Sequence, residues 1–233
     1  MESANEAFTI MLIIANVIFS WKGFSNKTFF ERYLFNTGRI LGGREYIRVL
    51  TSGFLHANIG HLMFNMIALY SFSVGVGTVF GFGAYLVVYF GSLFAGNLMA
   101  LYIHRNDPGY RAVGASGAVC GVIYSSVIMF PGSAISILFL PFAIPSWLFG
   151  ILFIFVSVYG IRSGLGNIGH EAHLGGAMSG VVISVMIKPS LLAAQPLLIA
   201  GLLSLTGAFL YLMVKRPDLL RIKGPGSRWK NGR

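Results

Sequence analysis

Long apolar stretches separated by shorter polar segments dominate this chain. A transmembrane helix needs about 20 mostly apolar residues. The pattern predicts seven membrane-spanning helices, at Phe8–Trp21, Ile59–Gly77, Phe82–His104, Ala115–Phe130, Ser146–Ile161, Ala172–Ile187 and Leu191–Val214. The first and fifth stretches are short, so their helices are expected to extend into the flanking residues. The expected fold is an all-α, polytopic membrane helical bundle.

Two connecting segments are informative. The loop Lys22–Leu55 is too long for a turn and carries aromatic residues among its charges, which favours a structured segment lying partly in the membrane interface. The stretch Ala134–Pro145 is interrupted by Pro141 and Pro145, so it is interpreted as a loop or interfacial segment rather than a span.

Composition supports a membrane protein. Of the 233 residues 55% are hydrophobic and only 10% are charged, whereas soluble domains carry roughly 25% charged residues. We therefore expect an integral multi-pass membrane protein. The predicted organisation is a six-helix core at residues 1–189, an additional transmembrane helix at 190–214 and a basic tail at 215–233. The helix at 190–214 follows Lys188-Pro189 and lacks ionisable residues, which indicates an appended helix outside any site.

The net charge of +10 is concentrated in the loop after the first span and in the tail. Because the tail directly follows a predicted span, its basic residues favour contact with lipid headgroups or a role in topology over nucleic-acid binding. The lipid bilayer is therefore an expected partner, and nucleic acid is not.

Few polar residues lie at membrane depth, and such residues are costly and are by default functional candidates. Most lie at the starts of the second, fourth and sixth predicted spans, namely His56, His61, Asn65, Ser116, Glu171 and His173, with His170 just before the sixth. Asn97 lies in the third span. None of the seven carboxylates is central to a predicted span, which excludes an aspartyl-type intramembrane protease.

Glycine spacing predicts how two of these spans pack. Gly117 and Gly121 are four residues apart, as are Gly176 and Gly180, and each pair fits the small-xxx-small pattern of closely packed membrane helices. His173 lies on the same face as the second pair. If the fourth and sixth spans pack through these faces, Ser116 and His173 meet near one membrane surface.

A serine and a histidine that meet in this way can form an activated nucleophile. Ser116 also begins a predicted helix, where free N–H groups and the helix dipole favour developing negative charge. His61 and Asn65 are four residues apart, so they share one helix face and could supply side-chain donors to the same oxyanion.

Each of these residues also has a structural interpretation. A serine between glycines in a membrane helix can serve packing alone, and a histidine at a span edge can be an interfacial polar group. Asn97 is interpreted as an interhelical contact and Cys120 as a small core residue. The stretch 170-HEAH-173 lacks the H-E-x-x-H spacing of zinc proteases and has no obvious third ligand, so no metal is expected.

Three separated motifs, 56-HANIGHLMFN-65, 114-GASG-117 and 172-AHLGG-176, resemble those of the rhomboid family of intramembrane serine proteases. The resemblance covers roughly Phe8–Ile187 and includes the lead-in 44-REYIRVLTSGFLH-56. The seventh helix resembles that of the six-plus-one members. The resemblance implies a serine endopeptidase that needs no cofactor or metal and cuts transmembrane protein substrates near the membrane surface. A bacterial cell (inner) membrane is the expected location.

The resemblance also implies roles for individual residues. Ser116 matches the nucleophile, flanked by Gly114 and Gly117, and His173 matches the general base, followed by Gly176. The absence of an aspartate partner is expected, because the family uses a Ser-His dyad.

His61, Asn65 and the backbone N–H of Ser116 match the oxyanion hole, and His56 matches a histidine that is structural or assists the site. One position departs from the pattern. Many members carry an aromatic residue four positions after the serine, stacked on the base, where this chain has Cys120.

Membrane orientation is left open. The usual topology of the family, combined with seven spans, places every basic residue except Lys188 on the side opposite the cytoplasm, against the positive-inside rule. Two other functions also remain open at this stage. One is a catalytically silent relative that binds or chaperones membrane clients, and the other is a transporter or channel, disfavoured by the lack of mid-membrane charges and of an inverted repeat.

Overall fold

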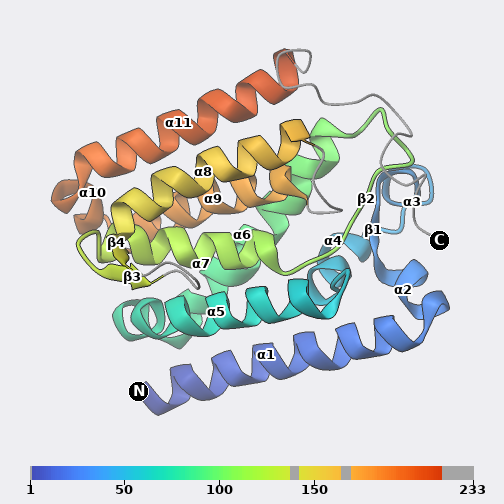
Figure 1. The fold of residues 1–233 in the computed structure, drawn as a ribbon, viewed down its shortest axis with the longest axis horizontal. Coiled ribbons are helices and arrows are strands. Elements are labelled where there is room, and N and C mark those ends of the chain that lie inside the picture. The colour runs from blue at the N-terminus through green and yellow to red at the C-terminus, as the bar shows by residue number, and fades with distance from the viewer. Residues whose placement is uncertain (1, 137–141, 164–168, 217–233) are drawn as a thin grey trace.

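The computed structural model describes residues 2–136, 142–163 and 169–216 and is dominated by helices (Figure 1). In chain order the helices are α1 (Glu2–Ser25), α2 (Lys27–Tyr33), α3 (Thr37–Leu41), α4 (Arg48–Thr51), the 3-10 helix η1 (Ser52–Phe54), α5 (Ile59–Phe80), α6 (Phe82–Ile103), α7 (Ser116–Met129), α8 (Ser146–Ser163), α9 (His170–Ile187), α10 (Ser190–Ala194) and α11 (Pro196–Lys215). The strands are β1 (Phe35–Asn36), β2 (Arg111–Ala112), β3 (Ala134–Ser136) and β4 (Ala143–Pro145).

The long helices lie side by side as one bundle, with α1 at one edge, α11 at the other and α9 in contact with both α6 and α7 (Figure 1). The small elements α2, α3, α4, β1 and β2 gather at one end, and β3, β4 and α10 at the opposite end. The predicted all-α bundle is confirmed. Four described helices are long and apolar enough to cross a membrane, namely Glu6–Ser25, Ile59–Phe80, Phe82–Ile103 and Pro196–Lys215.

The structure differs from the predicted elements in two places. The stretch predicted as one helix at Leu191–Val214 is two helices, α10 and α11, because Pro196 opens α11 and disfavours helical backbone at Gln195, which has φ −135° and ψ 49°. The segment Ala134–Pro145, expected to be a loop or interfacial segment rather than a span, contains the paired strands β3 and β4. The predicted basic tail falls outside the described residues from position 217 onward.

Helices α7 and α9 touch through their glycines, as the spacing predicts. A Cβ placed on Gly176 would collide with the carbonyl oxygen of Gly117, and one on Gly180 would collide with that of Gly121. The two backbones are therefore in direct contact at two positions one helical turn apart, which only residues without side chains allow.

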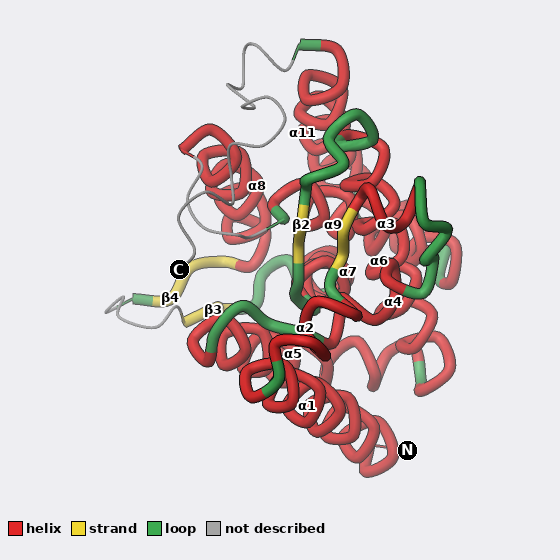
Figure 2. The backbone as a smooth tube through the Cα atoms, turned by 90° about the vertical axis from the view of Figure 1, so that its right-hand side faces the viewer, coloured by secondary structure: helices red, strands yellow, loops and turns green. Residues whose placement is uncertain are grey.

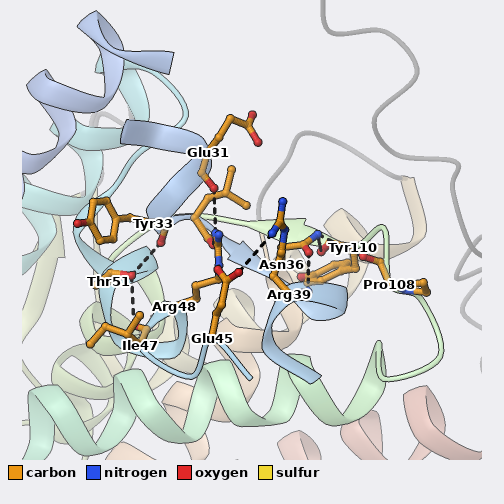
Figure 3. Close-up of polar contacts among 11 residues, drawn as sticks. Glu31, Tyr33, Asn36, Arg39, Glu45, Ile47, Arg48, Thr51, Pro108 and Tyr110 are labelled. Carbon is orange, nitrogen blue, oxygen red and sulfur yellow. Dashed lines mark hydrogen bonds and ion pairs between the residues drawn. The ribbon is translucent and has the colours of Figure 1, made fainter. Parts of the chain in front are cut away.

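The loop after α1 is held together by one buried arginine (Figure 3). Arg48 is 4% exposed, and its guanidinium donates to the carbonyl oxygens of Glu31 at 2.9 Å and Leu34 at 2.8 Å. It also donates to the Glu45 carboxylate at 2.6 Å, and this hydrogen bond holds the pKa of Glu45 below its ordinary value. The prediction that this loop is structured is confirmed.

Two further contacts place this loop against the bundle. Strand β1 pairs antiparallel with β2, so Phe35 lies opposite Ala112 (Figure 2). Asn97 of α6 donates to the carbonyl oxygen of Val49 at 2.7 Å and to the hydroxyl of Ser52 at 3.3 Å. Asn97 thus links α6 to α4 and η1, and the loop is fixed beside the segment that leads into α7.

Candidate active site

Three helices begin at the same end of the bundle and bring the predicted site residues together. Ser116 is the first residue of α7, His61 lies in the first turn of α5, and His173 lies in the first turn of α9. A cavity of about 470 Å³ joins them and is lined by Asn58, Gly60, His61, Phe64, Asn65, Ala68, Ser116, Val119, Cys120, Ile123, Phe153 and His173. Four of the predicted residues, Ser116, His173, His61 and Asn65, therefore face one cavity.

Gly114 shapes the approach to Ser116. Its φ of +133° is a conformation that L side chains rarely adopt, and its N–H donates to the carbonyl oxygen of Ser52 at 3.0 Å. A Cβ at this position would lie 2.8 Å from Cε1 of His61 and 3.5 Å from Oγ of Ser116. The glycine therefore lets the His61 ring come close to the serine hydroxyl.

His56 contacts the residue before Ser116 and is fully buried. Its Nε2 accepts a hydrogen bond from the backbone N–H of Ala115 at 3.4 Å, and its Nδ1 lies 2.8 Å from Oγ of Ser20, which donates to the carbonyl oxygen of Phe54 at 3.0 Å. Because Nε2 accepts, the proton of a neutral ring sits on Nδ1 and is donated to Ser20. His56 thus fixes the residue before Ser116 to α1.

The start of α5 presents hydrogen-bond donors to the cavity. Asn58 caps the helix, since its Oδ1 accepts from the N–H of His61 at 2.8 Å. Asn65 donates through Nδ2 to the carbonyl oxygen of His61 at 2.9 Å, which leaves the second N–H of that amide for another acceptor. Within the described residues, Nδ1 of His61 is buried and has no hydrogen-bond partner.

His173 is buried against the same cavity, with 8% of its surface exposed. Neither of its ring nitrogens has a hydrogen-bond partner in the described part of the chain, so Ser116 and His173 share the cavity without a hydrogen bond between them. The ring of Phe153 lies 5.9 Å from the ring of His173 at an angle of 36°, and the ring of His170 lies 5.2 Å away at 77°.

Sequence reasoning gave no role to several residues that line the cavity, among them Asn58 and Phe153. Asn58 carried a usable signal, because an asparagine just before an apolar run is typical of a helix N-cap. Phe153 carried none, since it is one of several aromatic residues in an apolar span. It supplies from α8 an aromatic contact with His173 that Cys120, also in the cavity wall, does not make.

The sequence predicts no specific role for Glu171, and its side chain is not part of the cavity wall. Its Oε1 lies 3.0 Å from Nε2 of His104. Across the described residues, no group of three histidine, cysteine or carboxylate side chains could hold a metal ion. The expectation of a site without metal or cofactor stays a prediction.

The fold and the cavity thus define a polytopic membrane protein with a serine, histidines and an asparagine gathered at one end of its bundle. The rhomboid domain family matches residues 43–190. The chain therefore belongs to the rhomboid family.

Its relatives include both mitochondrial and bacterial proteins. The chain is 29% identical over 195 residues to RHOMBOID-like protein 12, mitochondrial, of Arabidopsis thaliana, covering 76% of this chain and 57% of that protein. It is 31% identical over 139 residues to Rhomboid protein 1, mitochondrial, of Saccharomyces cerevisiae, covering 58% and 40%. It is 27% identical over 177 residues to Rhomboid protease GluP of Bacillus subtilis, covering 75% and 33%.

The chain spans about half the length of the first two relatives. Together with the apolar helices, the family establishes an integral membrane protein. The expected bacterial cell membrane is not supported, because two of these relatives are mitochondrial.

Proposed function

We propose that this protein is an intramembrane serine endopeptidase that cleaves transmembrane protein substrates near the membrane surface through a Ser116–His173 dyad. The observation that carries the proposal is the single cavity, which Ser116, His173, His61 and Asn65 line from the starts of three helices. The name of the Bacillus subtilis relative, a rhomboid protease, supports the same class of reaction.

The geometry suggests how the reaction would proceed. The Ser116 hydroxyl attacks the substrate carbonyl carbon while His173 takes its proton, and His173 then returns that proton to the leaving amine. Water hydrolyses the resulting acyl-enzyme. The hydrogen bond between the two side chains would form as substrate binds, since catalytic hydrogen bonds often tighten only in the complex.

Two helices that line the cavity offer donors to the oxyanion. Ser116 is the first residue of α7, so its backbone N–H is one of the groups without a partner inside the helix. The second amide N–H of Asn65 and the ring of His61 come from α5, which lines the same cavity. The α7 dipole adds a favourable field at the same point.

The expected substrate is a transmembrane segment with residues that weaken its helix. A peptide bond inside a regular helix is not open to attack, and unwinding it in the membrane exposes backbone groups that lipid cannot satisfy. The site lies at helix starts rather than at mid-bundle, so the substrate has to unwind only near the surface.

The proposal is tested by labelling the protein, purified in detergent, with a fluorophosphonate probe and mapping the modified residue by mass spectrometry. Modification of Ser116, absent in Ser116→Ala, is the expected result, because only an activated serine reacts at a useful rate. A folded wild-type protein that does not react would instead favour the catalytically silent alternative. The absence of a hydrogen bond between Ser116 and His173 in this structure is the observation that favours the silent alternative.

A second prediction concerns Asn65. Asn65→Ala is expected to lower kcat for substrate cleavage about 10²–10³-fold with little change in KM, because an oxyanion donor acts mainly in the transition state. Steady-state cleavage kinetics of the purified variant measure both constants. Thr78→Ala, which removes a hydroxyl bound to the carbonyl oxygen of Val74 further along α5, is the control and should keep the wild-type kcat. A KM increase at unchanged kcat would assign Asn65 to substrate binding.

A further inference from the structure

A second buried polar cluster lies outside the cavity wall and consists of His104, Tyr110 and Glu171. Oε1 of Glu171 lies 3.0 Å from Nε2 of His104, and Oε2 accepts from the Tyr110 hydroxyl at 3.4 Å. The rings of His104 and Tyr110 stack with their centres 3.7 Å apart and 6° from parallel. The cluster therefore joins three side chains by two hydrogen bonds and one ring stack.

The cluster is buried, and its carboxylate is fully enclosed. Glu171 is 0% exposed, Tyr110 4% and His104 7%. A buried carboxylate is costly unless it is hydrogen-bonded and paired. Here it also lies in the first turn of α9, where the helix dipole favours negative charge. Both oxygens are bound, so the carboxylate has one well-defined position.

Tyr110 connects the carboxylate to the nucleophile. Tyr110 lies six positions before Ser116 in sequence, and backbone hydrogen bonds hold the connecting segment. Its residues Arg111 and Ala112 pair with β1, and Gly114 donates to Ser52. The carbonyl oxygen of Tyr110 itself accepts from the Asn36 side chain at 3.3 Å (Figure 3). This segment has little freedom to move independently of Tyr110.

Glu171 connects the same cluster to the base. His173 follows it by two residues in the first turn of α9, and the N–H of His173 donates to the carbonyl oxygen of Gly169 at 3.2 Å. A Cβ on Gly169 would lie 3.3 Å from the Tyr110 hydroxyl, so the start of α9 lies directly against the nucleophile segment. The ring nitrogens of His173 have no hydrogen-bond partner among the described residues, so Glu171 does not hydrogen-bond the base and is linked to it through the backbone of α9.

We propose that Glu171 is a positioning residue that fixes the segment carrying Ser116 and the helix turn carrying His173 relative to each other, by binding Tyr110 with one carboxylate oxygen and His104 with the other. The inference rests on the proposed function, since it assigns Glu171 to the same dyad. The positioning role of Glu171 differs from that of the carboxylate in a catalytic triad, because Glu171 does not hydrogen-bond the base.

The kinetic test compares Glu171→Gln and Tyr110→Phe with the wild-type full chain. Each variant is expected to lower kcat and the rate of fluorophosphonate labelling about 10–100-fold at unchanged KM, because a displacement near 1 Å costs about that much in rate. The double variant should be no slower than the worse single variant, since both changes release the same contact. Additive losses, or a Glu171→Gln variant with wild-type kcat, would overturn the proposal.

A matched control separates positioning from stability. Ser184→Ala removes a buried hydrogen bond of 2.7 Å to Ser125 near the other end of α9. This variant should lower the Tm while keeping the wild-type kcat. If Ser184→Ala lowers kcat as much as Glu171→Gln at a matched loss of Tm, the role of Glu171 is purely structural and the proposal fails.

A measurement without catalysis keeps this inference separate from the proposed function. Hydrogen exchange followed by mass spectrometry is expected to show faster exchange in Glu171→Gln at both residues 110–116 and residues 170–174, and unchanged exchange at residues 180–187. Unchanged exchange at 110–116 would overturn the proposal even in an inactive protein. If Glu171→Gln shows this exchange pattern but the wild-type protein never reacts with the probe, only the proposed function is overturned.

Discussion

His173→Ala is expected to lower kcat for cleavage of a membrane substrate about 10²–10⁴-fold, the usual contribution of a general base. His173 and Ser116 line one cavity, and His173 is the histidine that α9 directs into it. Without the imidazole, Ser116 loses the group that accepts its proton and protonates the leaving amine. Cleavage kinetics and the rate of fluorophosphonate labelling should fall together, because both depend on an activated serine.

His170 provides a matched control on the same helix. It lies one turn before His173, with the ring centres 5.2 Å apart, but it is not part of the cavity wall. His170→Ala should therefore keep most of the activity that His173→Ala loses. The reverse order of effects would make His170 the base and would contradict the assignment. Equal losses in both variants, with a lowered Tm, would point to disruption of the first turn of α9.

The sequence predicted the bundle and the convergence of its polar helix starts because both depend on local pattern. Apolar stretches of span length predict helices, and the glycine pairs predict the approach of α7 to α9, which in turn places Ser116 and His173 on one cavity. These arguments need only residue types and spacing. The roles of Ser116, His173, His61 and Asn65 remain predictions that the variants above test.

Other features depend on contacts between distant segments and could not be predicted. The aromatic neighbour of His173 comes from Phe153 on another helix, while spacing within α7 points only to Cys120. The partners of Glu171 lie 67 and 61 positions earlier in the chain.

The break between α10 and α11 had a local signal in Pro196, but the strong apolar run around it favoured one continuous helix.

Gly176→Val is expected to prevent folding of the bundle, because α9 packs its glycine face directly on the backbone of α7. A Cβ at position 176 would overlap the carbonyl oxygen of Gly117, which is main-chain and cannot rotate away as a side chain could. The helices would have to separate, which removes the contacts between them and moves His173 away from Ser116. Since proteins are stable by only about 5–15 kcal/mol, such a separation is expected to be decisive.

The measurement is recovery of monodisperse protein in detergent by size-exclusion chromatography, followed by thermal unfolding of whatever is recovered. Gly207→Val is the control, because a Cβ at that position of α11 meets nothing within 4 Å, so the added side chain faces open space. Gly176→Ala should be intermediate, since its single methyl group already reaches the Gly117 carbonyl. A Gly176→Val variant with the yield and Tm of Gly207→Val would show that α7 and α9 do not need backbone contact. The link between glycine spacing and the placement of the dyad would then fail.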